Sequence, residues 1–317
     1  MSGIKILFID SNHPLLHETL QKAGFICELN YHWSKDEIVE HIHLYDGVVI
    51  RSKIKITRDI IDRGVNLKFI ARAGAGMENI DVVYAENKGI KCIHAPEGNR
   101  DAVAEHAIGM LLALFNNLCR ANKEVREGKW IREGNRGIEL MGKTAGIIGY
   151  GNMGSAFAER LKGFGVKILV YDKYKKNFGS TTIIETTQER LFEEADIISL
   201  HTPLTEETRH LINDSFISSF KKNIYIINTA RGKSLNTADL VKNMRSGKVL
   251  GACLDVLEYE AVSFEKLDMM SLPEPFHYLI QSDKAILSPH IAGWTFESNA
   301  KIARILAEKI KQSLIKP

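Results

Sequence analysis

Residues 145–154, AGIIGYGNMG, contain three glycines directly after a short apolar run. A short apolar run is followed by Gly149, Gly151 and Gly154, and the residues after Gly154 have the composition of a helix. In such a pattern the first glycine permits a tight turn, the second lets the backbone approach a pyrophosphate, and the third lets helix and strand pack closely. Because the N-terminus of the helix then faces the phosphates, the stretch predicts a dinucleotide-binding strand, turn and helix.

The second feature of this nucleotide site is Asp172, which ends the next apolar run, VKILVYD, about 20 residues further along. A carboxylate at this position accepts hydrogen bonds from the adenosine ribose and repels a 2′-phosphate, so we expect NAD rather than NADP as the cofactor. Lys173, Lys175 and Lys176 follow at once, and they either offset that repulsion or belong to a solvated loop. The alternative for the whole motif is an accidental glycine-rich turn, and the order of strand, helix and carboxylate argues against it.

Apolar runs alternate with helix-like segments along the whole chain. We expect strands in IKILFID (4–10), FICEL (25–29), GVVIR (47–51), LKFIARAG (67–74), KTAGIIGYG (143–151), VKILVYD (166–172), DIISLH (196–201), NIYIINTA (223–230), VLGACLDV (249–256) and KAILSPH (284–290). We expect helices over 14–23, 34–43, 57–63, 79–87, 154–163 and 189–194. Such alternation predicts parallel sheets flanked by helices, and 317 residues suffice for two domains. The fold class is therefore α/β, with two doubly wound parallel-sheet domains.

Four segments have additional helix signals. Ser34 followed by Glu37 is a capping box, and Thr57 precedes an acidic first turn. Residues 102–128 are apolar on more than one side, which predicts one long helix buried between domains or subunits, too polar at its ends to span a bilayer. Residues 296–314 have apolar side chains at helical spacing, which predicts an amphipathic helix.

Composition and charge argue against several classes of protein. With 42 basic and 39 acidic residues the net charge is +3, so no large single-sign field favours nucleic acid or an anionic membrane as a partner. Cys27, Cys92, Cys119 and Cys253 form no CxxC motif, and histidines 41 and 43 point differently on a helix, so we expect neither a metal site nor disulfides. The sequence has neither a signal peptide nor an apolar run of about 18 residues, and we expect a cytoplasmic protein.

Seven motifs in order resemble the D-isomer-specific 2-hydroxyacid dehydrogenase family. They are RAGAGMENID (72–81), HAPEGNRDAVAEHAIGMLLAL (94–114), GYGNMG (149–154), HTPLTEETRHLIN (201–213), NTARG (228–232), GACLDVLEYE (251–260) and SPHIAG (288–293). The resemblance implies a Rossmann NAD-binding domain over 98–293, inserted into a discontinuous, flavodoxin-like substrate-binding domain over 1–97 and 294–317. It also implies a homodimer held through the cofactor domains, with much of the contact from residues 101–140.

The family's catalytic residues fall on Arg231, Glu260 and His290. A guanidinium is a planar fork of donors that can bind a substrate carboxylate and polarise the oxygen on C2. An imidazole suits proton transfer near neutral pH, so His290 would accept the hydroxyl proton during oxidation and return it during reduction. Glu260 would hold that imidazole in one tautomer and favour its protonated form. We interpret His106, inside the 102–128 segment, as a structural residue.

The resemblance also implies cofactor and substrate contacts. The cofactor would be bound by Gly149, Gly151, Asn152, Met153, Gly154, Asp172, Thr202, Pro203, Thr229, Ala230, Asp255 and Gly293. The substrate would be bound by Arg51, Ser52, Arg72, Gly74, Ala75 and Gly76. Asp255 would lie beside the nicotinamide carboxamide, and residues 74–76 would present backbone N–H groups to the carboxylate. The chain departs from the family at Ala261, where proline is common, and at Trp294, where a small residue is common.

The substrate expectation depends on two arginines. In the phosphoglycerate-oxidising members of the family, arginines at the positions of Arg51 and Arg72 meet a phosphate, so we expect oxidation of D-3-phosphoglycerate to 3-phosphohydroxypyruvate, the first step of serine biosynthesis. Salt bridges at domain edges are the alternative for both arginines. A glyoxylate or hydroxypyruvate reductase is the second possibility, and a non-catalytic dinucleotide-sensing corepressor is the third. Because no regulatory domain follows residue 317, we expect no feedback through such a module.

Overall fold

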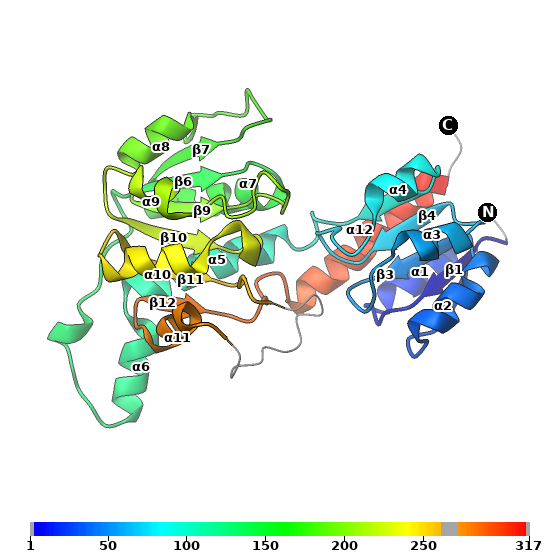
Figure 1. The fold of residues 1–317 in the computed structure, drawn as a ribbon, viewed down its shortest axis with the longest axis horizontal. Coiled ribbons are helices and arrows are strands. Elements are labelled where there is room, and N and C mark those ends of the chain that lie inside the picture. The colour runs from blue at the N-terminus through cyan, green and yellow to red at the C-terminus, as the bar shows by residue number, and fades with distance from the viewer. Residues whose placement is uncertain (1–2, 261–271, 315–317) are drawn as a thin grey trace. The chain divides into compact units, whose positions relative to one another are not determined.

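The computed structural model describes residues 3–260 and 272–314, and it divides the chain into two compact units. The first unit combines Met1–Arg100 with Trp294–Pro317, and the second is Asp101–Gly293. Each unit contains one parallel β-sheet with helices on both faces, which confirms the two doubly wound α/β domains (Figure 1). Ala261, one of the two departures from the family pattern, lies outside the described residues.

The first unit has a five-stranded sheet in the order β2-β1-β3-β4-β5, the flavodoxin-like arrangement. Its strands are β1 (Lys5–Phe8), β2 (Ile26–Leu29), β3 (Gly47–Ile50), β4 (Phe69–Arg72) and β5 (Lys91–His94). Helices α1 (Leu15–Lys22) and α12 (Phe296–Leu314) pack in the core on one face. Helices α2 (Lys35–His41), α3 (Arg58–Arg63) and α4 (Val82–Asn87) pack in the core on the other, with a short 3₁₀ turn, η1 (Ile42–Leu44).

The second unit has a seven-stranded sheet in the order β12-β11-β10-β9-β6-β7-β8. Its strands are β6 (Thr144–Ile148), β7 (Lys167–Tyr171), β8 (Ile183–Glu185), β9 (Ile197–Leu200), β10 (Ile224–Asn228), β11 (Val249–Leu254) and β12 (Ala285–Leu287). Its α-helices are α5 (Arg100–Phe115), α6 (Leu118–Arg126), α7 (Asn152–Leu161), α8 (Gln188–Glu194), α9 (Asp214–Ser218), α10 (Thr237–Arg245) and α11 (Glu274–Gln281). The chain order reverses between β6 and β9, and ligands of open parallel sheets bind at the carboxyl ends of the strands beside such a point.

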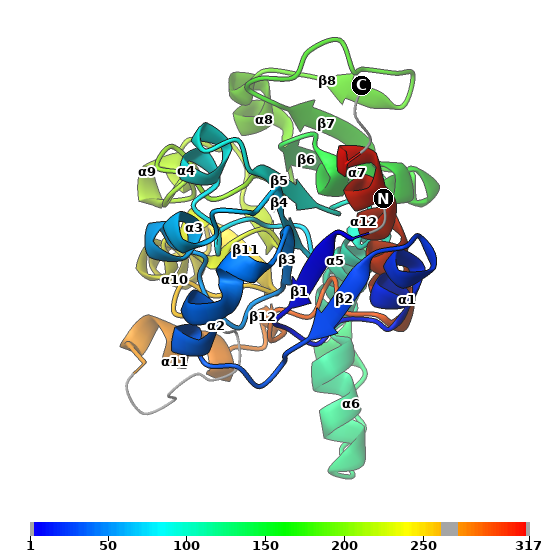
Figure 2. The same cartoon turned by 90° about the vertical axis from the view of Figure 1, so that its right-hand side faces the viewer.

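The 102–128 segment is not the single helix that its apolar pattern predicts. It breaks at Asn117, whose φ of 51° is left-handed, and α5 and α6 meet at a bend of 61°. Asparagine tolerates this conformation better than most side chains, which explains why the break falls there. Helix α5 is buried in the core of the second unit, whereas α6 has no buried residue and projects away from that unit's sheet (Figures 1 and 2).

The remaining differences from the sequence expectations are local. The capping box is present, because the Ser34 hydroxyl accepts the Glu37 N–H and the Glu37 carboxylate accepts the Ser34 N–H. Thr57 precedes α3, but its hydroxyl donates to Asp59 instead of capping the helix. The apolar face predicted for α12 starts at Phe296, but this side chain is 93% exposed. The buried face of α12 therefore starts further along the helix. Strands β5 and β8 and helices α9, α10 and α11 were not expected from the sequence.

Candidate active site

The phosphate loop follows β6 and has the backbone that its three glycines predict. Gly149 has a φ of 92°, and a Cβ there would lie 2.7 Å from the carbonyl oxygen of His201. A Cβ on Gly154 would lie 2.0 Å from the Gly149 carbonyl oxygen, so helix α7 and the turn touch only because residue 154 lacks a side chain. By contrast, a Cβ on Gly151 would meet nothing within 4 Å. Gly151 precedes α7, whose N-terminus has no side-chain cap, so the loop leaves backbone N–H groups facing open space.

Asp172 lies just past the end of β7, beside this loop. Its Oδ2 accepts the Tyr150 N–H at 2.7 Å, and its Oδ1 accepts the N–H groups of Tyr174 and Lys175 at 2.9 and 2.8 Å. Burial alone would raise the pKa of Asp172, but the hydrogen bonds from these three N–H groups hold the pKa below its ordinary value. The carboxylate is therefore ionised at neutral pH and fixed against the phosphate loop.

The three lysines after Asp172 all have partners in the structure. Lys173 forms an ion pair with Glu207, Lys175 donates to the Tyr150 carbonyl at 3.2 Å, and Lys176 donates to the Asp172 carbonyl at 3.1 Å. All three side chains are exposed. Their arrangement matches a solvated loop better than a cluster assembled around a phosphate.

Two buried hydroxyl groups support the presence of a ligand at this end of the sheet. Thr202 follows β9 and Thr229 follows β10, and among the described residues neither Oγ1 has a hydrogen-bond partner. Buried hydroxyls without partners are uncommon in native proteins, and a bound molecule is one explanation. His201 is buried, which lowers its pKa to about 3 and keeps the ring neutral beside the loop. The open space at Gly151, the uncapped α7 and these hydroxyls fit a dinucleotide.

The next part of the site is the turn after β10, which contains Arg231. Asn228, 1% exposed, holds the turn, because its Nδ2 donates to the Arg231 carbonyl and its Oδ1 accepts the Ala230 N–H. The Arg231 guanidinium donates to the Ala230 carbonyl at 2.7 Å. A Cβ on Gly232 would lie 1.9 Å from the Leu257 carbonyl oxygen, so this turn packs directly on the loop after β11. Asn228 was not among the site residues expected from the sequence.

The structure brings Glu260 and His290 into direct contact. Glu260 follows β11 and His290 follows β12, and the His290 Nδ1 lies 2.8 Å from the Glu260 Oε2. The other carboxylate oxygen, Oε1, accepts the Leu257 N–H, which fixes the orientation of the carboxylate. The imidazole is 26% exposed and the carboxylate 15%. Because a carboxylate only accepts, the His290 Nδ1 carries the hydrogen, and Nε2 is the nitrogen that can exchange a proton with a ligand.

Asp255 has surroundings that the sequence did not indicate. It is 1% exposed, and its carboxylate accepts the Ile291 and Ala292 N–H groups, each at 2.9 Å. The carboxylate therefore holds the turn that carries His290 against the end of β11. Gly293 follows this turn directly.

In the first unit, Arg51, Ser52 and Arg72 lie at the carboxyl ends of β3 and β4. The Asp10 carboxylate accepts the N–H groups of Arg51 and Ser52 at 2.6 and 3.1 Å, a contact the sequence did not suggest. The Arg72 Nε donates to the Arg51 carbonyl at 3.2 Å. The Arg51 guanidinium stacks on Trp294, 3.9 Å from the ring centroid. Trp294, the second departure from the family pattern, thus contacts Arg51, one of the expected substrate residues.

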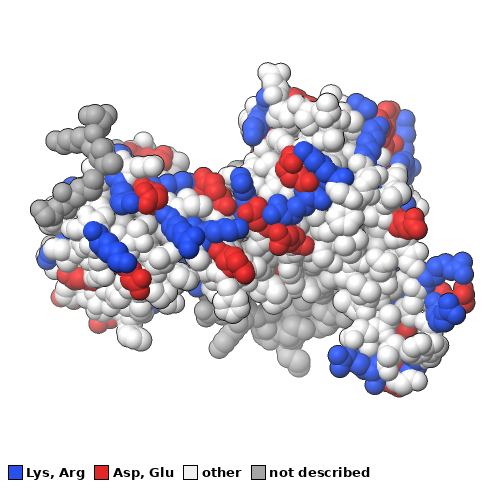
Figure 3. All heavy atoms as spheres, turned by 180° about the vertical axis from the view of Figure 1, so that it is seen from behind, with Lys and Arg blue, Asp and Glu red and all other residues white. Residues whose placement is uncertain are grey.

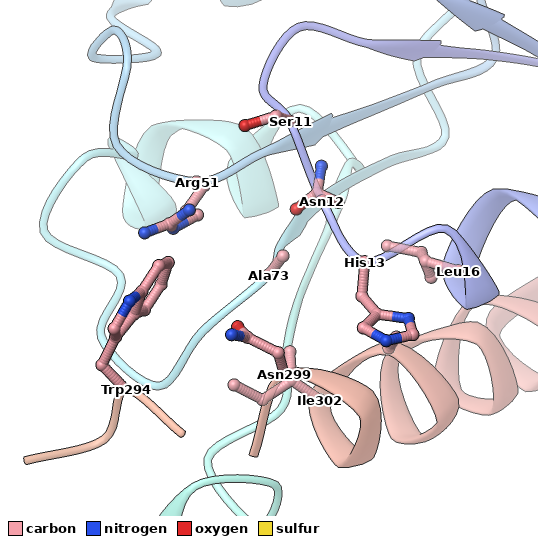
Figure 4. A pocket seen from close by; sticks show the side chains of 10 residues that line it. Ser11, Asn12, His13, Leu16, Arg51, Ala73, Trp294, Asn299 and Ile302 are labelled. Atoms are coloured by element: carbon pink, nitrogen blue, oxygen red, sulfur yellow. The ribbon is translucent and has the colours of Figure 1, made fainter. Parts of the chain in front are cut away.

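Arg51 and Trp294 line a pocket of about 190 Å³ in the first unit (Figure 4). Ser11 and Asn12, from the loop after β1, and Asn299, from α12, form other parts of its wall. Arg72 does not line this pocket. The two arginines therefore have different surroundings. The Arg51 guanidinium lies at a cavity, and the Arg72 guanidinium donates a hydrogen bond to the neighbouring backbone.

Residues 74–76 follow β4. The Gly74 carbonyl accepts the Ala95 N–H at 3.0 Å, and a Cβ on Gly74 would lie 2.7 Å from a nitrogen of the Arg72 guanidinium. The Ala75 carbonyl accepts a hydrogen bond from the His94 Nδ1 at 2.5 Å. Contacts to the end of β5 thus hold this loop.

Three other properties concern possible partners and ligands. On the face shown in Figure 3, basic side chains are interspersed with acidic ones. Among the described residues no single helix is long and apolar enough to cross a membrane, and the bent pair α5 and α6 passes only a test of length and composition. No group of three or more potential metal ligands occurs within 3–260 and 272–314.

Comparison with known proteins places this site in a family. The model of the NAD binding domain of D-isomer specific 2-hydroxyacid dehydrogenases matches residues 108–292. A hydroxypyruvate reductase from Thermotoga maritima is 42% identical over 307 residues, covering 96% of this chain and 97% of that protein. A D-3-phosphoglycerate dehydrogenase from Methanocaldococcus jannaschii is 37% identical, covering 98% of this chain and 57% of that protein. The chain thus spans little more than half of the latter relative.

A solved structure agrees with the family model and with the two relatives. The crystal structure of D-lactate dehydrogenase from Aquifex aeolicus, complexed with NAD and lactic acid, superposes with a TM-score of 0.81 at 29% sequence identity. The match covers 97% of this chain and 94% of that one.

Proposed function

The chain belongs to the D-isomer-specific 2-hydroxyacid dehydrogenase family, and from that premise we propose that it interconverts D-3-phosphoglycerate and 3-phosphohydroxypyruvate with NAD. Family membership makes the chain an NAD-dependent oxidoreductase. The choice of this substrate depends on one observation, the Arg51 guanidinium held at the wall of a pocket in the first unit. A phosphorylated three-carbon acid has a dianion that such a cation would bind.

In the proposed reaction His290 is the acid and base. Its Nε2 would accept the proton of the C2 hydroxyl during oxidation and return it during reduction, while Glu260 holds Nδ1–H and stabilises the imidazolium that forms. NAD, when bound, accepts or returns the hydride at its nicotinamide ring. Gly149, Gly151 and the N-terminus of α7 would hold its pyrophosphate.

Arg231 would bind the substrate carboxylate and the C2 oxygen. Its position on a turn fixed by Asn228 supports this role, because a guanidinium orients a substrate only when its own backbone is held. In the first unit, Ser52 and the N–H groups of 74–76 are proposed to bind substrate together with Arg51.

The substrate assignment predicts that replacing Arg51 by alanine raises the KM for 3-phosphohydroxypyruvate roughly 10- to 100-fold, since a charge-assisted hydrogen bond contributes about 1.5 to 3 kcal/mol. The KM for unphosphorylated hydroxypyruvate should stay within about twofold of wild type, because that substrate lacks the dianion. Steady-state kinetics on both keto acids with NADH measure this. Arg63→Ala, at the exposed end of α3, is the matched control.

Arg72→Ala separates phosphate binding from support of the backbone. A loss on 3-phosphohydroxypyruvate alone would place Arg72 at the phosphate, and an equal loss on both keto acids would mean that it supports the Arg51 backbone. Equal losses in Arg51→Ala, or a wild type that prefers hydroxypyruvate, would contradict the phosphoglycerate assignment.

Hydroxypyruvate reduction is the second candidate function. The observation that favours it is the Thermotoga maritima hydroxypyruvate reductase, which matches this chain over 97% of its own length. The same side-by-side kinetics decide between the two substrates. The corepressor alternative would leave the protein without turnover on either keto acid.

Asp172 is proposed to select NAD over NADP. Replacing it by alanine should lower the ratio of kcat/KM with NAD to that with NADP by roughly 10-fold or more, because the variant loses both the ribose contact and the repulsion of a 2′-phosphate. Kinetics with each cofactor at a fixed substrate concentration measure the ratio. Asp196→Ala, a carboxylate at the opposite end of the same sheet, tests for a general effect of charge removal. An unchanged ratio in Asp172→Ala would show that another residue reads the ribose.

We also propose that the protein is a homodimer held through the cofactor domains, with much of the contact from residues 101–140. Large apolar side chains are exposed on and after α6, namely Leu118, Val125, Trp130, Ile131, Ile138 and Met141. Trp130 is 81% exposed. Exposed apolar patches of this kind are often covered by a partner chain. Light scattering should give twice the chain mass of 35.6 kDa, and Trp130→Glu should shift it toward the monomer. A monomeric wild type would contradict the proposal.

A further inference from the structure

The carboxylate of Asp255 holds one turn of the second unit, residues 288–292. Its Oδ1 accepts the Ser288 hydroxyl at 2.6 Å and the Ile291 N–H at 2.9 Å, and its Oδ2 accepts the Ala292 N–H at 2.9 Å. The backbone adds two bonds, from the Ser288 N–H to the Leu254 carbonyl and from the His290 N–H to the Asp255 carbonyl. The conformation of this turn therefore depends on a carboxylate that is 1% exposed.

His290 occupies the strained position of the turn. Its φ is 55°, in the left-handed region that residues other than glycine rarely adopt. Side chains in that region persist only where their surroundings hold the backbone in place. Because the direction of the Cα–Cβ bond follows from this backbone conformation, the contact between the His290 Nδ1 and Glu260 also depends on it.

A further residue, His106 on α5, forms a hydrogen bond with the Ser288 hydroxyl. Its Nε2 lies 2.8 Å from the Ser288 Oγ and 3.5 Å from the Asp255 Oδ1. The Ser288 hydroxyl has one hydrogen, and the 2.6 Å contact to a carboxylate oxygen requires that hydrogen. The His106 Nε2 must then be the donor to Ser288, so the ring carries a hydrogen on Nε2.

We propose that His106 is a positioning residue for His290, acting through Ser288 and Asp255. The His106 N–H orients the Ser288 hydroxyl toward Asp255, and Asp255 then holds the turn in the conformation that aims the His290 ring. The inference rests on the acid and base role proposed for His290. It assigns to His106 a part in the reaction, although His106 lies 182 residues from Ser288 in the sequence and need not touch substrate or cofactor.

The test compares three substitutions at His106 and Ser288. His106→Leu removes the donor, Ser288→Ala removes the relay hydroxyl, and each should lower kcat roughly 10- to 100-fold with the KM for NADH within about twofold of wild type. His106→Gln keeps an N–H near the position of Nε2 and should restore kcat to within about threefold of wild type. His277→Leu, on α11, is the matched control and should leave kcat unchanged. The assay is reduction of the keto acid that wild type turns over faster, 3-phosphohydroxypyruvate or hydroxypyruvate.

A double-mutant cycle shows whether the effect passes through His290. In a His290→Gln background, adding His106→Leu should change the residual rate by less than about twofold, because the ring that it positions is gone. An equal drop in both backgrounds would overturn the inference, as would a wild-type kcat in His106→Leu. Thermal melting and NADH binding, measured on every variant, identify any loss of folding. Should His106→Leu not fold, Ser288→Ala and its conservative partner Ser288→Thr decide by the same cycle.

The cycle also separates this inference from the proposed function. A His290→Gln variant with near-normal turnover would remove the role of His290 itself. A slow His290→Gln beside a fast His106→Leu would contradict only the positioning role.

Discussion

Replacing His290 by alanine is expected to lower kcat by roughly 100- to 10,000-fold, the contribution of a positioned acid or base. The reason is that the His290 Nε2 is the group proposed to exchange a proton with the C2 oxygen, and Glu260 fixes the tautomer that makes this possible. Binding of NADH, followed by its fluorescence, should be almost unchanged, because the phosphate loop and Asp172 lie on other strands. Steady-state kinetics and a binding titration measure the two quantities on the same preparation.

Two further variants make this result specific. His210→Ala removes a histidine that pairs with Glu258 at 2.7 Å in the same unit, and it should retain most of the activity. Glu260→Gln should lower kcat less than His290→Ala does, since the amide can still hold the ring but cannot compensate its charge. Turnover of His290→Ala within about threefold of wild type would contradict the proposed acid and base role.

Replacing Arg231 by alanine is the second large effect that we expect. A substrate carboxylate held by two charge-assisted hydrogen bonds gains about 1.5 to 3 kcal/mol from each, so kcat/KM should fall by roughly 100- to 10,000-fold. Arg231→Lys should recover only part of that loss, because an ammonium group cannot reproduce the planar pair of donors. The measurement is kcat/KM on the preferred keto acid, with melting temperature as the test of folding.

Arg245→Ala is the control for Arg231. Arg245 ends α10 in the same unit and forms an exposed ion pair with Glu274, so its removal should change stability by less than about 1 kcal/mol and leave kcat/KM unchanged. Full recovery by Arg231→Lys would show that charge alone is needed, and a kcat/KM loss below about tenfold in Arg231→Ala would assign the carboxylate to another group.

Local features of the fold could be predicted because the physical constraint lies within a few residues. The turn at Gly149 requires a positive φ, and a glycine within a strand, turn and helix pattern indicates this without knowledge of distant contacts. The capping box at Ser34 is similar, since both of its hydrogen bonds join residues three apart. The alternation of apolar runs likewise predicted the two parallel sheets.

Features created by distant contacts could not be predicted in the same way. The Asp10 carboxylate holds the turn at Arg51 from 41 residues away, and the contact exists only because β1 pairs with β3. The break at Asn117 was not predicted either, because the apolar pattern of 102–128 indicates no boundary there, although asparagine tolerates the left-handed φ of 51° better than most residues. The place of His106 inside a helical segment favours a structural role, and nothing near it in the sequence indicates its contacts with Ser288 and Asp255.

Turnover of paired D and L enantiomers would distinguish a D-isomer-specific dehydrogenase from other dinucleotide-binding proteins. The wild-type protein is assayed with D- and L-2-hydroxy acids and NAD, and with the corresponding 2-keto acids and NADH, at the nicotinamide absorbance band. We predict reduction of NAD by D enantiomers, led by D-3-phosphoglycerate, little or no reduction by L enantiomers, and oxidation of NADH by the keto acids. A protein that binds NADH yet turns over none of these substrates, or that prefers L enantiomers, would contradict the account.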